Sequence, residues 1–425
     1  MSKFKIITFG CKVNAYESEG FKEDLLSKGF VEAKDDEEAD ICIVNTCAVT
    51  STAERKCLQA VRRMSKANPN ISIGVVGCSS QINKDKYLEI SGVKTVYGNT
   101  EKSRVVQDLI KEVNTDNVLP SIRHVEYDAQ TITKFGHEVR AFVKIQDGCD
   151  NFCSYCIIPF TRGNSRSRKA QDIVDEIQLL INSGYKEVVL TGIDIGSYKE
   201  PIDGYGFSSL LALILKTFDG QVRFRISSLE ESQINEEVIS LYGMYPTTLV
   251  PHLHIPLQSG SETILKAMRR KYDLKSFIEL TDTLKRRFEY LALSTDVIVG
   301  FPGETEELFM ETYNFIEKVG FMRLHVFPYS RRPGTLANSM KEQVEQSVKN
   351  DRVRRLIALG DKLSKEYMTK FIGVPLDLLI EEKLEDNKYR GYTQNYLDLM
   401  VESTEDLMGK MVKVSIDKDF KAHII

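Results

Sequence analysis

The feature that most constrains this chain is a loop with three cysteines, Cys149, Cys153 and Cys156, in C-x3-C-x2-C spacing. Soft thiolate ligands select iron–sulfur clusters or zinc. A structural zinc site normally has four protein ligands, and this loop has no fourth cysteine. Three thiolates on a [4Fe–4S] cluster leave one iron open, whereas clusters that only transfer electrons are normally held by four cysteines. The loop predicts a cluster that binds a substrate at its open iron, and a zinc knuckle is the alternative.

Three further cysteines, Cys11, Cys47 and Cys78, each follow a strand-like run, namely FKIITF, ICIVN and ISIGVV. Helical patterns separate these runs, and the resulting βαβαβ order implies a parallel sheet. The carboxyl ends of such strands meet at one edge, so the three thiols should converge in space. Whether they hold a metal stays open on this pattern alone. Cys42 and Cys57 fall inside apolar and helical patterns, and we expect them to be buried thiols.

The alternation of strand-like and helical patterns predicts an α/β protein of several parts. A polar stretch over 114–134 is expected to link the first two. Six β/α units after it indicate an incomplete barrel, whose catalytic face should be the rim at the carboxyl ends of the strands. In order, the predicted parts are a parallel-sheet N-terminal domain (1–120), a partial (β/α)6 TIM-type barrel (135–340), a helical connector (341–371) and a small C-terminal β-barrel (372–425).

Composition limits where in the cell the protein is expected and which classes of partner it can bind. No run approaches the roughly 20 apolar residues of a membrane span, and the first residues lack the apolar stretch of a signal peptide. We therefore expect a cytoplasmic protein without a membrane partner. A net charge of −4 gives no general attraction to nucleic acid. An RNA partner would have to be held by local basic patches, and we expect no DNA partner.

The cysteine loop, with the aromatic Tyr155 before its last cysteine, resembles the radical S-adenosylmethionine superfamily. Motifs along nearly the whole chain narrow this to a resemblance to the methylthiotransferase family, with a C-terminal segment similar to a TRAM module. These motifs are GCKVNAYESE (10–19), NTCAVT (45–50), GC (77–78), CIIPFTRGNSRSR (156–168), PLQSGS (256–261), DVIVGFPGET (296–305) and FPYSRRPGT (327–335).

Within that family, GCKVN and GYTQNY look most like the MtaB-type enzymes. The resemblance implies methylthiolation at C2 of N6-threonylcarbamoyladenosine, position 37 of tRNA, with the anticodon stem-loop as partner. It also implies S-adenosylmethionine and two [4Fe–4S] clusters, one on Cys149, Cys153 and Cys156 and a second on Cys11, Cys47 and Cys78. One S-adenosylmethionine would methylate sulfur, and a second would yield the radical that activates C2. A sulfur donor and an electron donor, both unidentified, complete the expected partners.

S-adenosylmethionine needs contacts beyond the iron, and strand-end residues on the barrel rim are the candidates. An ordinary polar loop role is the alternative for each side chain. With Tyr155, the aromatic residue of the cysteine loop, the candidates are Gly192, Asp194, Ser228, Glu230, Gln258, Val299 and Gly300.

Basic clusters mark candidate RNA contacts, because lysine and arginine neutralise phosphate. A solvated surface is the alternative. The C-terminal module has more acidic than basic residues, so RNA contact there would depend on shape and aromatic stacking. The candidates are Arg162, Arg166, Arg168, Lys169, Arg331, Arg332, Lys388, Arg390, Tyr392 and Asn395.

Three other functions remain compatible with the sequence. The same chemistry could act on isopentenyladenosine in tRNA or on an aspartate of a ribosomal protein. A radical enzyme of another reaction type could use the first cluster for electron transfer. A non-catalytic iron–sulfur RNA-binding protein is the alternative from a different class.

Overall fold

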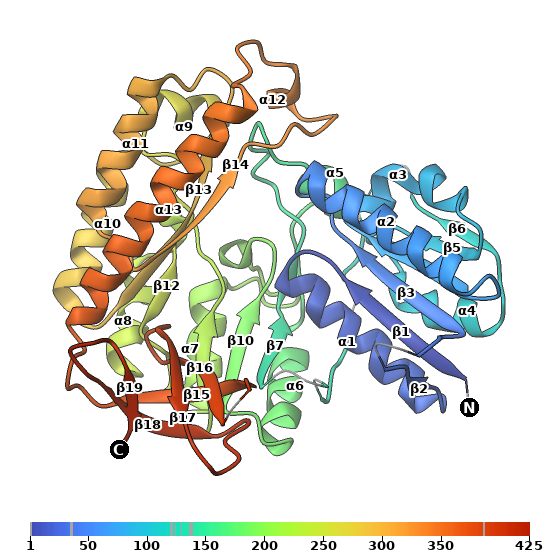
Figure 1. Cartoon of the computed structure of the whole chain (residues 1–425), viewed down its shortest axis with the longest axis horizontal. Coiled ribbons are helices and arrows are strands. Elements are labelled where there is room, and N and C mark those ends of the chain that lie inside the picture. Colours follow the sequence, from blue (N-terminus) through green and yellow to red (C-terminus); the bar gives the residue numbers. More distant parts are fainter. Residues whose placement is uncertain are drawn as a thin grey trace.

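The computed structural model describes residues 2–34, 37–119, 122–123, 125–128, 130–134, 136, 139–385 and 387–425. The N-terminal domain is a six-stranded parallel sheet in the order β2-β1-β3-β4-β5-β6 (Figure 1). Its strands are β1 (Lys3–Thr8), β2 (Val31–Glu32), β3 (Ile41–Thr46), β4 (Ser72–Gly77), β5 (Val93–Tyr97) and β6 (Thr115–Asn117). The predicted parallel sheet is confirmed, and it extends through β6 into the stretch expected to be a linker.

Alternating strand residues face two different helix layers, as a sheet buried on both sides requires. On one face, Phe4 and Ile43 pack against helices α1 (Lys12–Ser27) and α4 (Val105–Ile110). On the other, Cys42 and Val44 pack against α2 (Ser51–Ala67) and α3 (Cys78–Leu88). A 3-10 turn over Lys102–Arg104 leads directly into the short helix α4. Cys42 and Cys57 are fully buried, as expected.

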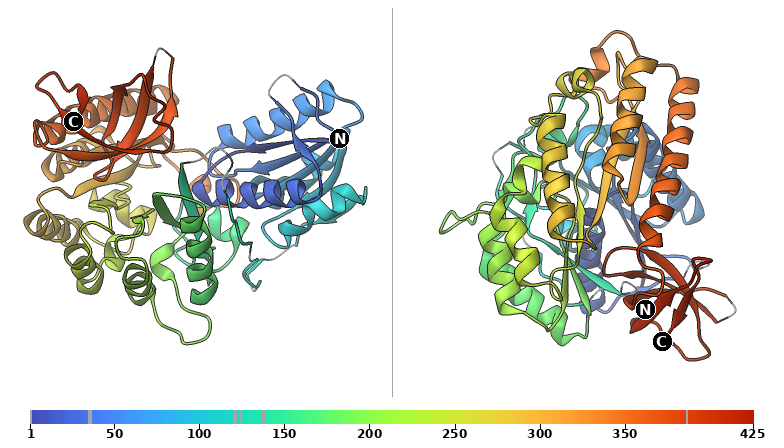
Figure 2. Two further views of the ribbon diagram at one scale, coloured as in Figure 1. Left: turned by 90° about the horizontal axis from the view of Figure 1, so that it is seen from below. Right: turned by 90° about the vertical axis from the view of Figure 1, so that its left-hand side faces the viewer.

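The second domain is an arc of six parallel strands in chain order, each followed by helical structure. The strands form two groups of three, joined by a bridge between Phe224 and Leu249. The strands are β7 (Arg140–Lys144), β10 (Glu187–Thr191), β11 (Arg223–Ile226), β12 (His252–His254), β13 (Ala292–Val299) and β14 (Arg323–Pro328). Among the described residues, β14 does not pair with β7, so the barrel is incomplete as predicted. The N-terminal domain lies beside this opening (Figure 2).

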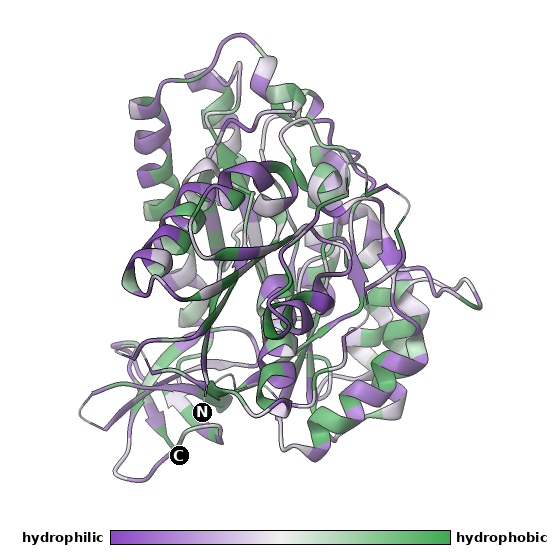
Figure 3. Ribbon diagram, turned by 90° about the vertical axis from the view of Figure 1, so that its right-hand side faces the viewer, coloured by the Kyte–Doolittle hydropathy of each residue, from purple (hydrophilic) through white to green (hydrophobic). Residues whose placement is uncertain are grey.

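Helices cover the outside of the arc, and hydrophilic and hydrophobic residues alternate along them (Figure 3). The helices of this domain are α5 (Ile158–Arg162), α6 (Ala170–Asn182), α7 (Phe207–Thr217), α8 (Glu236–Met244), α9 (Glu262–Met268), α10 (Leu274–Arg287), α11 (Glu306–Val319), α12 (Leu336–Ser339) and α13 (Gln346–Thr369). The short helix α5 is not on the outside of the arc, because it packs against α3 of the N-terminal domain. The predicted connector contains α13, which packs along β14 so closely that Gly360 meets Leu324. This helix therefore completes the last β/α unit as well as leading onward. No helix of the described part is long and apolar enough for a bilayer.

The C-terminal module is a nearly closed antiparallel barrel in the order β17-β16-β15-β18-β19. It lies at the amino-terminal ends of the barrel strands, at the bottom of Figure 1. Arg223 and Arg225 at the start of β11 donate hydrogen bonds to the carbonyl oxygens of Tyr392 and Thr393, at 3.2 and 3.3 Å. The strands are β15 (Leu376–Lys383), β16 (Lys388–Thr393), β17 (Asp398–Glu402), β18 (Met411–Ile416) and β19 (Ala422–Ile424).

Candidate active site

Cys11, Cys47 and Cys78 lie at the carboxyl ends of β1, β3 and β4, at one edge of the N-terminal sheet. Glycines with positive φ allow the tight turns. Gly10 (φ 102°) lies so near Cys47 that an added Cβ would stand 3.0 Å from its sulfur, and Gly77 (φ 105°) faces the Thr46 carbonyl in the same way. Each thiol lies within the electrostatic field of another. The edge thus gathers three thiols from three strands.

The second triad lies on the loop between β8 (Gln146–Asp147) and α5, at the carboxyl-end rim of the arc. Cys149 accepts a hydrogen bond from the backbone N–H of Asn151 at 3.5 Å, and Cys153 accepts one from Arg270 at 3.5 Å. The two triads are neighbours, because Ile157 packs on Cys78 in one small buried cluster. Two separate cysteine sets therefore open toward the same region between the domains.

Burial and nearby N–H donors mark the environment of thiols in both triads. Burial raises the pKa of Cys47 and of Cys156 to about 12, so these thiols stay protonated unless a metal supplies positive charge. N–H donors already point at the sulfurs, including the Asn99 amide at 3.4 Å from Cys78, as is usual around iron–sulfur thiolates. Among the described residues, no three ligands converge closely enough for a single ion.

A buried network of charges joins the two triads. Glu17 of α1 pairs with Lys102 at 2.6 Å and Lys144 at 2.8 Å, and Asp147 pairs with Arg162 at 2.9 Å. Burial alone would raise the pKa of Glu17, but Lys102, Lys144 and Arg162 lower it well below its usual range. Both carboxylates are therefore ionised, and they lock the N-terminal domain to the cysteine loop.

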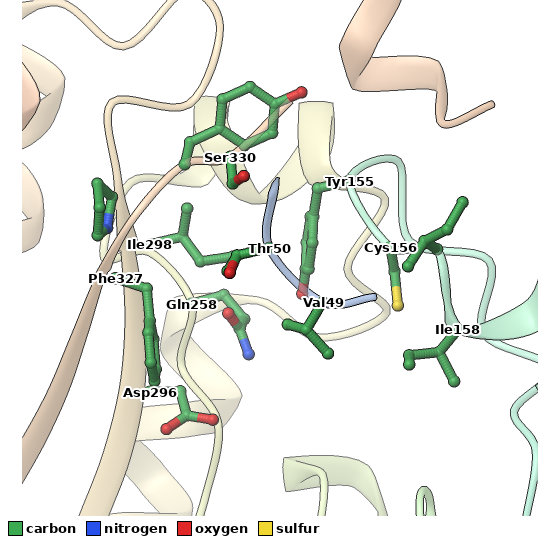
Figure 4. A pocket seen from close by; sticks show the side chains of 13 residues that line it. Val49, Thr50, Tyr155, Cys156, Ile158, Gln258, Asp296, Ile298, Phe327 and Ser330 are labelled. Atoms are coloured by element: carbon green, nitrogen blue, oxygen red, sulfur yellow. The ribbon is translucent and has the colours of Figure 1, made fainter. Parts of the chain in front are cut away.

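A cavity of about 230 Å³ lies between the triads and is lined by both domains (Figure 4). Val49 and Thr50 enter it from the loop after Cys47. Cys156 lies on one side, and Phe327 and Asp296 lie on the opposite side (Figure 4). The rest of the lining includes Tyr155, Gln258, Ile298, Tyr329 and Ser330. A small molecule in this cavity would touch both cysteine loops at once.

The candidates for S-adenosylmethionine fall into four groups, three of which lie near the cavity and the cysteine loop. Tyr155 and Gln258 line the cavity, and Gln258 has a positive φ of 62° that directs its backbone into hydrogen bonds with β13. Asp194 binds Asn151 at 3.0 Å, and Glu230 forms an ion pair with Arg270, so both surround the cysteine loop. Gly192 and Ser228 are half-buried on the same rim.

Val299 is the last residue of β13 and Gly300 follows it, beyond the cavity. Val299 is fully buried. The Gly300 N–H donates to Glu304 at 2.5 Å, and a Cβ at Gly300 (φ 71°) would clash with Lys349. Only backbone atoms of this turn can therefore contact a ligand.

Four of the ten expected RNA contacts are paired with acidic residues, and three of them are buried while Arg166 is half-buried. Arg162 and Arg166 bind Asp147, Arg168 binds Glu176, and Arg332 binds Glu54. None of these four guanidinium groups presents its charge to solvent, which corrects the expectation of RNA contact for them. Asn395 is also buried, and Tyr392 stacks on Tyr396 at 4.9 Å between the C-terminal module and the barrel. Lys169, Arg331, Lys388 and Arg390 are exposed.

Sequence reasoning missed several residues that shape the site. Arg270 belongs to a basic run that reads as a solvated patch, yet it reaches Cys153. Gln146 accepts from the Ile193 and Asp194 backbone N–H groups at 3.1 and 2.8 Å, and it thereby holds the turn after β10. In the sequence, only the positions of Arg270 and Gln146 close to the rim motifs could have indicated that they shape the site.

Comparison with known proteins agrees with this architecture. Residues 3–98 match a family described as "Uncharacterized protein family UPF0004", and residues 143–316 match the radical SAM superfamily. The Bacillus subtilis "Threonylcarbamoyladenosine tRNA methylthiotransferase MtaB" is 43% identical over 97% of this chain and 93% of its own. A "tRNA-2-methylthio-N(6)-dimethylallyladenosine synthase" of Thermoanaerobacter is 36% identical over 97% and 90%. The solved radical S-adenosylmethionine methyltransferase TsrM of Kitasatospora setae superposes with a TM-score of 0.58 at 14% identity, covering 80% of this chain and 74% of that one.

An arc of six β/α units with three thiols on its carboxyl-end rim defines the class of the protein: it is a radical S-adenosylmethionine enzyme. Sequence identity of 43% and 36% to the two tRNA-modifying relatives, over nearly the whole chain, narrows the class further. The chain belongs to the methylthiotransferase family.

Proposed function

We propose that this enzyme transfers a methylthio group to C2 of N6-threonylcarbamoyladenosine in tRNA. One observation supports methylthio transfer: thiol triads from two domains flank one cavity, with Val49 and Thr50 from one side and Tyr155 and Cys156 from the other. A site that joins carbon to sulfur needs its radical source and its sulfur source next to the same substrate atom. The name of the Bacillus subtilis relative supports the nucleoside.

The two triads would each hold a [4Fe–4S] cluster. When bound, the clusters supply the electron that cleaves S-adenosylmethionine and the site that carries sulfur. The chain itself excludes water and orients the reactants: Tyr155 and Ile298 offer apolar surfaces inside the cavity, and Gln258 and Asp296 offer polar groups. The rest of the cavity must admit the edge of a base, which therefore has to leave its stack in the loop of the RNA.

The exposed basic residues Lys169, Arg331, Lys388 and Arg390 are the proposed contacts with the anticodon stem-loop. They belong to different parts of the fold, which suits a partner that spans the barrel rim and the C-terminal module. The proposal implies work in the cytoplasm, where tRNA is processed, together with a sulfur donor and an electron donor.

Mass spectrometry of tRNA nucleosides tests the function. A strain lacking the gene should lose 2-methylthio-N6-threonylcarbamoyladenosine, and the wild-type gene should restore it. A gene with Cys149→Ala should not restore it, and Cys42→Ala, in the sheet core, is the matched control that should. The dimethylallyladenosine reaction is the second candidate, because a relative with that name is 36% identical. Loss of 2-methylthio-isopentenyladenosine instead would establish that candidate.

A further inference from the structure

The inner wall of the arc continues from the cavity toward the C-terminal module along β14. Phe327 lines the cavity, and His325 and Arg323 follow it at alternate positions. Alternate residues of a strand share one face. The intervening Leu324 and Val326 pack into the core on the other face. Phe327, His325 and Arg323 therefore form one line on the concave side.

Asp296 on the neighbouring β13 ties this line to the cavity. It lines the cavity beside Phe327 (Figure 4). Its Oδ1 lies 3.4 Å from His254 Nε2 and 3.6 Å from His325 Nδ1. Asp296 is 31% exposed and His325 44% exposed, so the wall remains open to a ligand. A group that extends from the cavity along this wall meets polar side chains.

Cationic and aromatic side chains close the inside of the arc at the end that faces the C-terminal module. We call this surface, formed by Tyr396, Arg140, Arg225 and Arg323, the floor. Tyr396 of the C-terminal module lies under three guanidinium groups, with Arg225, Arg323 and Arg140 at 4.5, 5.1 and 5.8 Å from its ring. Arg323 is also 3.8 Å from Asp398 and 27% exposed. Aromatic faces attract these cations and hold them in place without neutralising them.

Positive charge exceeds negative charge around the floor. The guanidinium groups of Arg140, Arg223 and Arg225 share two carboxylates, Glu187 and Glu381. One positive charge is left uncompensated. Burial also raises the pKa of Glu381 to about 7, which weakens one of the two carboxylates further.

Lys12 adds a further cation from the N-terminal domain. It is exposed at the start of α1, and it interacts electrostatically with Tyr396, Arg140 and Arg225 as well as with Asp296. Among the described residues, its ammonium group has no ion-pair or hydrogen-bond partner. An unpaired lysine beside an excess of guanidinium groups lowers the stability of the folded protein unless an anion binds among them.

We propose that Lys12 and Arg323 bind the carboxylate of an anionic substituent on the substrate base. The inference rests on the proposed function, because the threonylcarbamoyl group on N6 carries such a carboxylate. With the base edge in the cavity, the substituent extends past Asp296 and His325 toward the floor. An uncharged isopentenyl group would leave Lys12 without a partner and would add no anion beside Arg323, so the same wall selects against it.

The test is binding of purified, cluster-loaded enzyme to three synthetic anticodon stem-loops that differ at one nucleotide. They carry adenosine, N6-threonylcarbamoyladenosine, or its methyl ester, in which the carboxylate is neutral. The wild type should bind the threonylcarbamoyl RNA about tenfold more tightly than either other RNA, as expected for a charge-assisted contact. Lys12→Gln should remove this preference and leave adenosine RNA unaffected, while Lys12→Arg should keep it.

Controls separate the proposed contact from damage to the site. Lys216→Gln, an exposed lysine on the outer helix α7, should behave as wild type. Because Lys12 follows Cys11, the iron content of Lys12→Gln must equal that of wild type. If it does not, Arg323→Gln takes its place with the same expected outcome, because the contacts of Arg323 in the described part of the chain are with Asp398, Tyr392 and Tyr396 and not with a cysteine of either triad. Equal losses for all three RNAs, or no loss, would overturn the inference.

The methyl ester distinguishes the two hypotheses. If the ester binds as tightly as the free carboxylate and both bind better than adenosine, the carboxylate contact is wrong while the proposed nucleoside stands. If the wild type binds all three RNAs equally and forms no methylthio product on the threonylcarbamoyl RNA, the proposed function itself is wrong.

Discussion

Arg162 of the barrel domain lies 3.3 Å from Glu17 of the N-terminal domain, and neither side chain is exposed to solvent beyond 1%. Such a pair is weak as a source of net stability but costly to break, since one charge is left buried without its partner. Arg162 also donates to Asn14 at 2.6 Å. The two domains are therefore held together by charges that water cannot reach.

Arg162→Met should lower the unfolding free energy by about 3 to 5 kcal/mol, because Glu17 and Asp147 lose a buried partner. Thermal unfolding of the cluster-loaded protein measures the loss as a lower midpoint. Arg354→Ala is the control, since its pair with Asp351 is exposed on α13 and should be worth under about 1 kcal/mol. Equal shifts for both variants would contradict the account.

The two triads should hold iron independently. Anaerobically reconstituted wild type should contain roughly eight irons, and triple alanine variants of either triad roughly four. The reason is that the ligand sets come from separate domains. Iron and sulfide analysis measures this, with Cys42→Ala as a control that should keep the full content. A wild type with only about four irons would rule out the second cluster.

Arg270 should raise the reduction potential of the cluster on the barrel triad. Its N–H group donates to Cys153, and a nearby positive charge favours the reduced cluster. Arg270→Gln should lower the potential by on the order of 50 mV, which corresponds to about 1 kcal/mol for one electron. Potentiometric titration followed by electron paramagnetic resonance measures it. The exposed neighbour Arg269, changed to Gln, should leave the potential unaltered.

Glu187 should make stability depend on acid pH. Burial opposes its ionisation, but Arg225, Arg223 and Arg140 lower its pKa well below 4.5. Because the folded-state pKa lies below the unfolded value, this contribution is complete above pH 4.5 and is lost as the pH falls toward the folded value. The stability gap between wild type and Glu187→Gln should therefore shrink from pH 7 to pH 3.

Denaturant unfolding at a series of pH values measures this gap. Glu311→Gln, at an exposed position on α11, is the control and should leave the pH profile of the wild type unchanged. A gap that stays constant down to pH 3 would mean that Glu187 is not ionised in the folded protein.

Strand-end cysteines were predictable because a parallel sheet gathers the carboxyl ends of its strands, whatever their distance along the chain. Which residues of a basic run are exposed could not be predicted. Arg162 and Lys169 belong to the same run of the sequence, yet one is fully buried and the other exposed. A run of basic residues in the sequence does not indicate that one of them has a distant partner such as Glu17, which lies 145 residues away.

The sequence by itself determined the two cysteine triads and the order of the β/α units, since thiol spacing and hydrophobic periodicity are local properties of the chain. Only the tertiary structure decided which charges are buried between domains and which face the inside of the arc. Lys12 shows the difference: it is one lysine among many in the sequence, and it faces the cationic floor only because α1 docks beside the open barrel. Long-range packing sets such neighbours, and no local pattern encodes them.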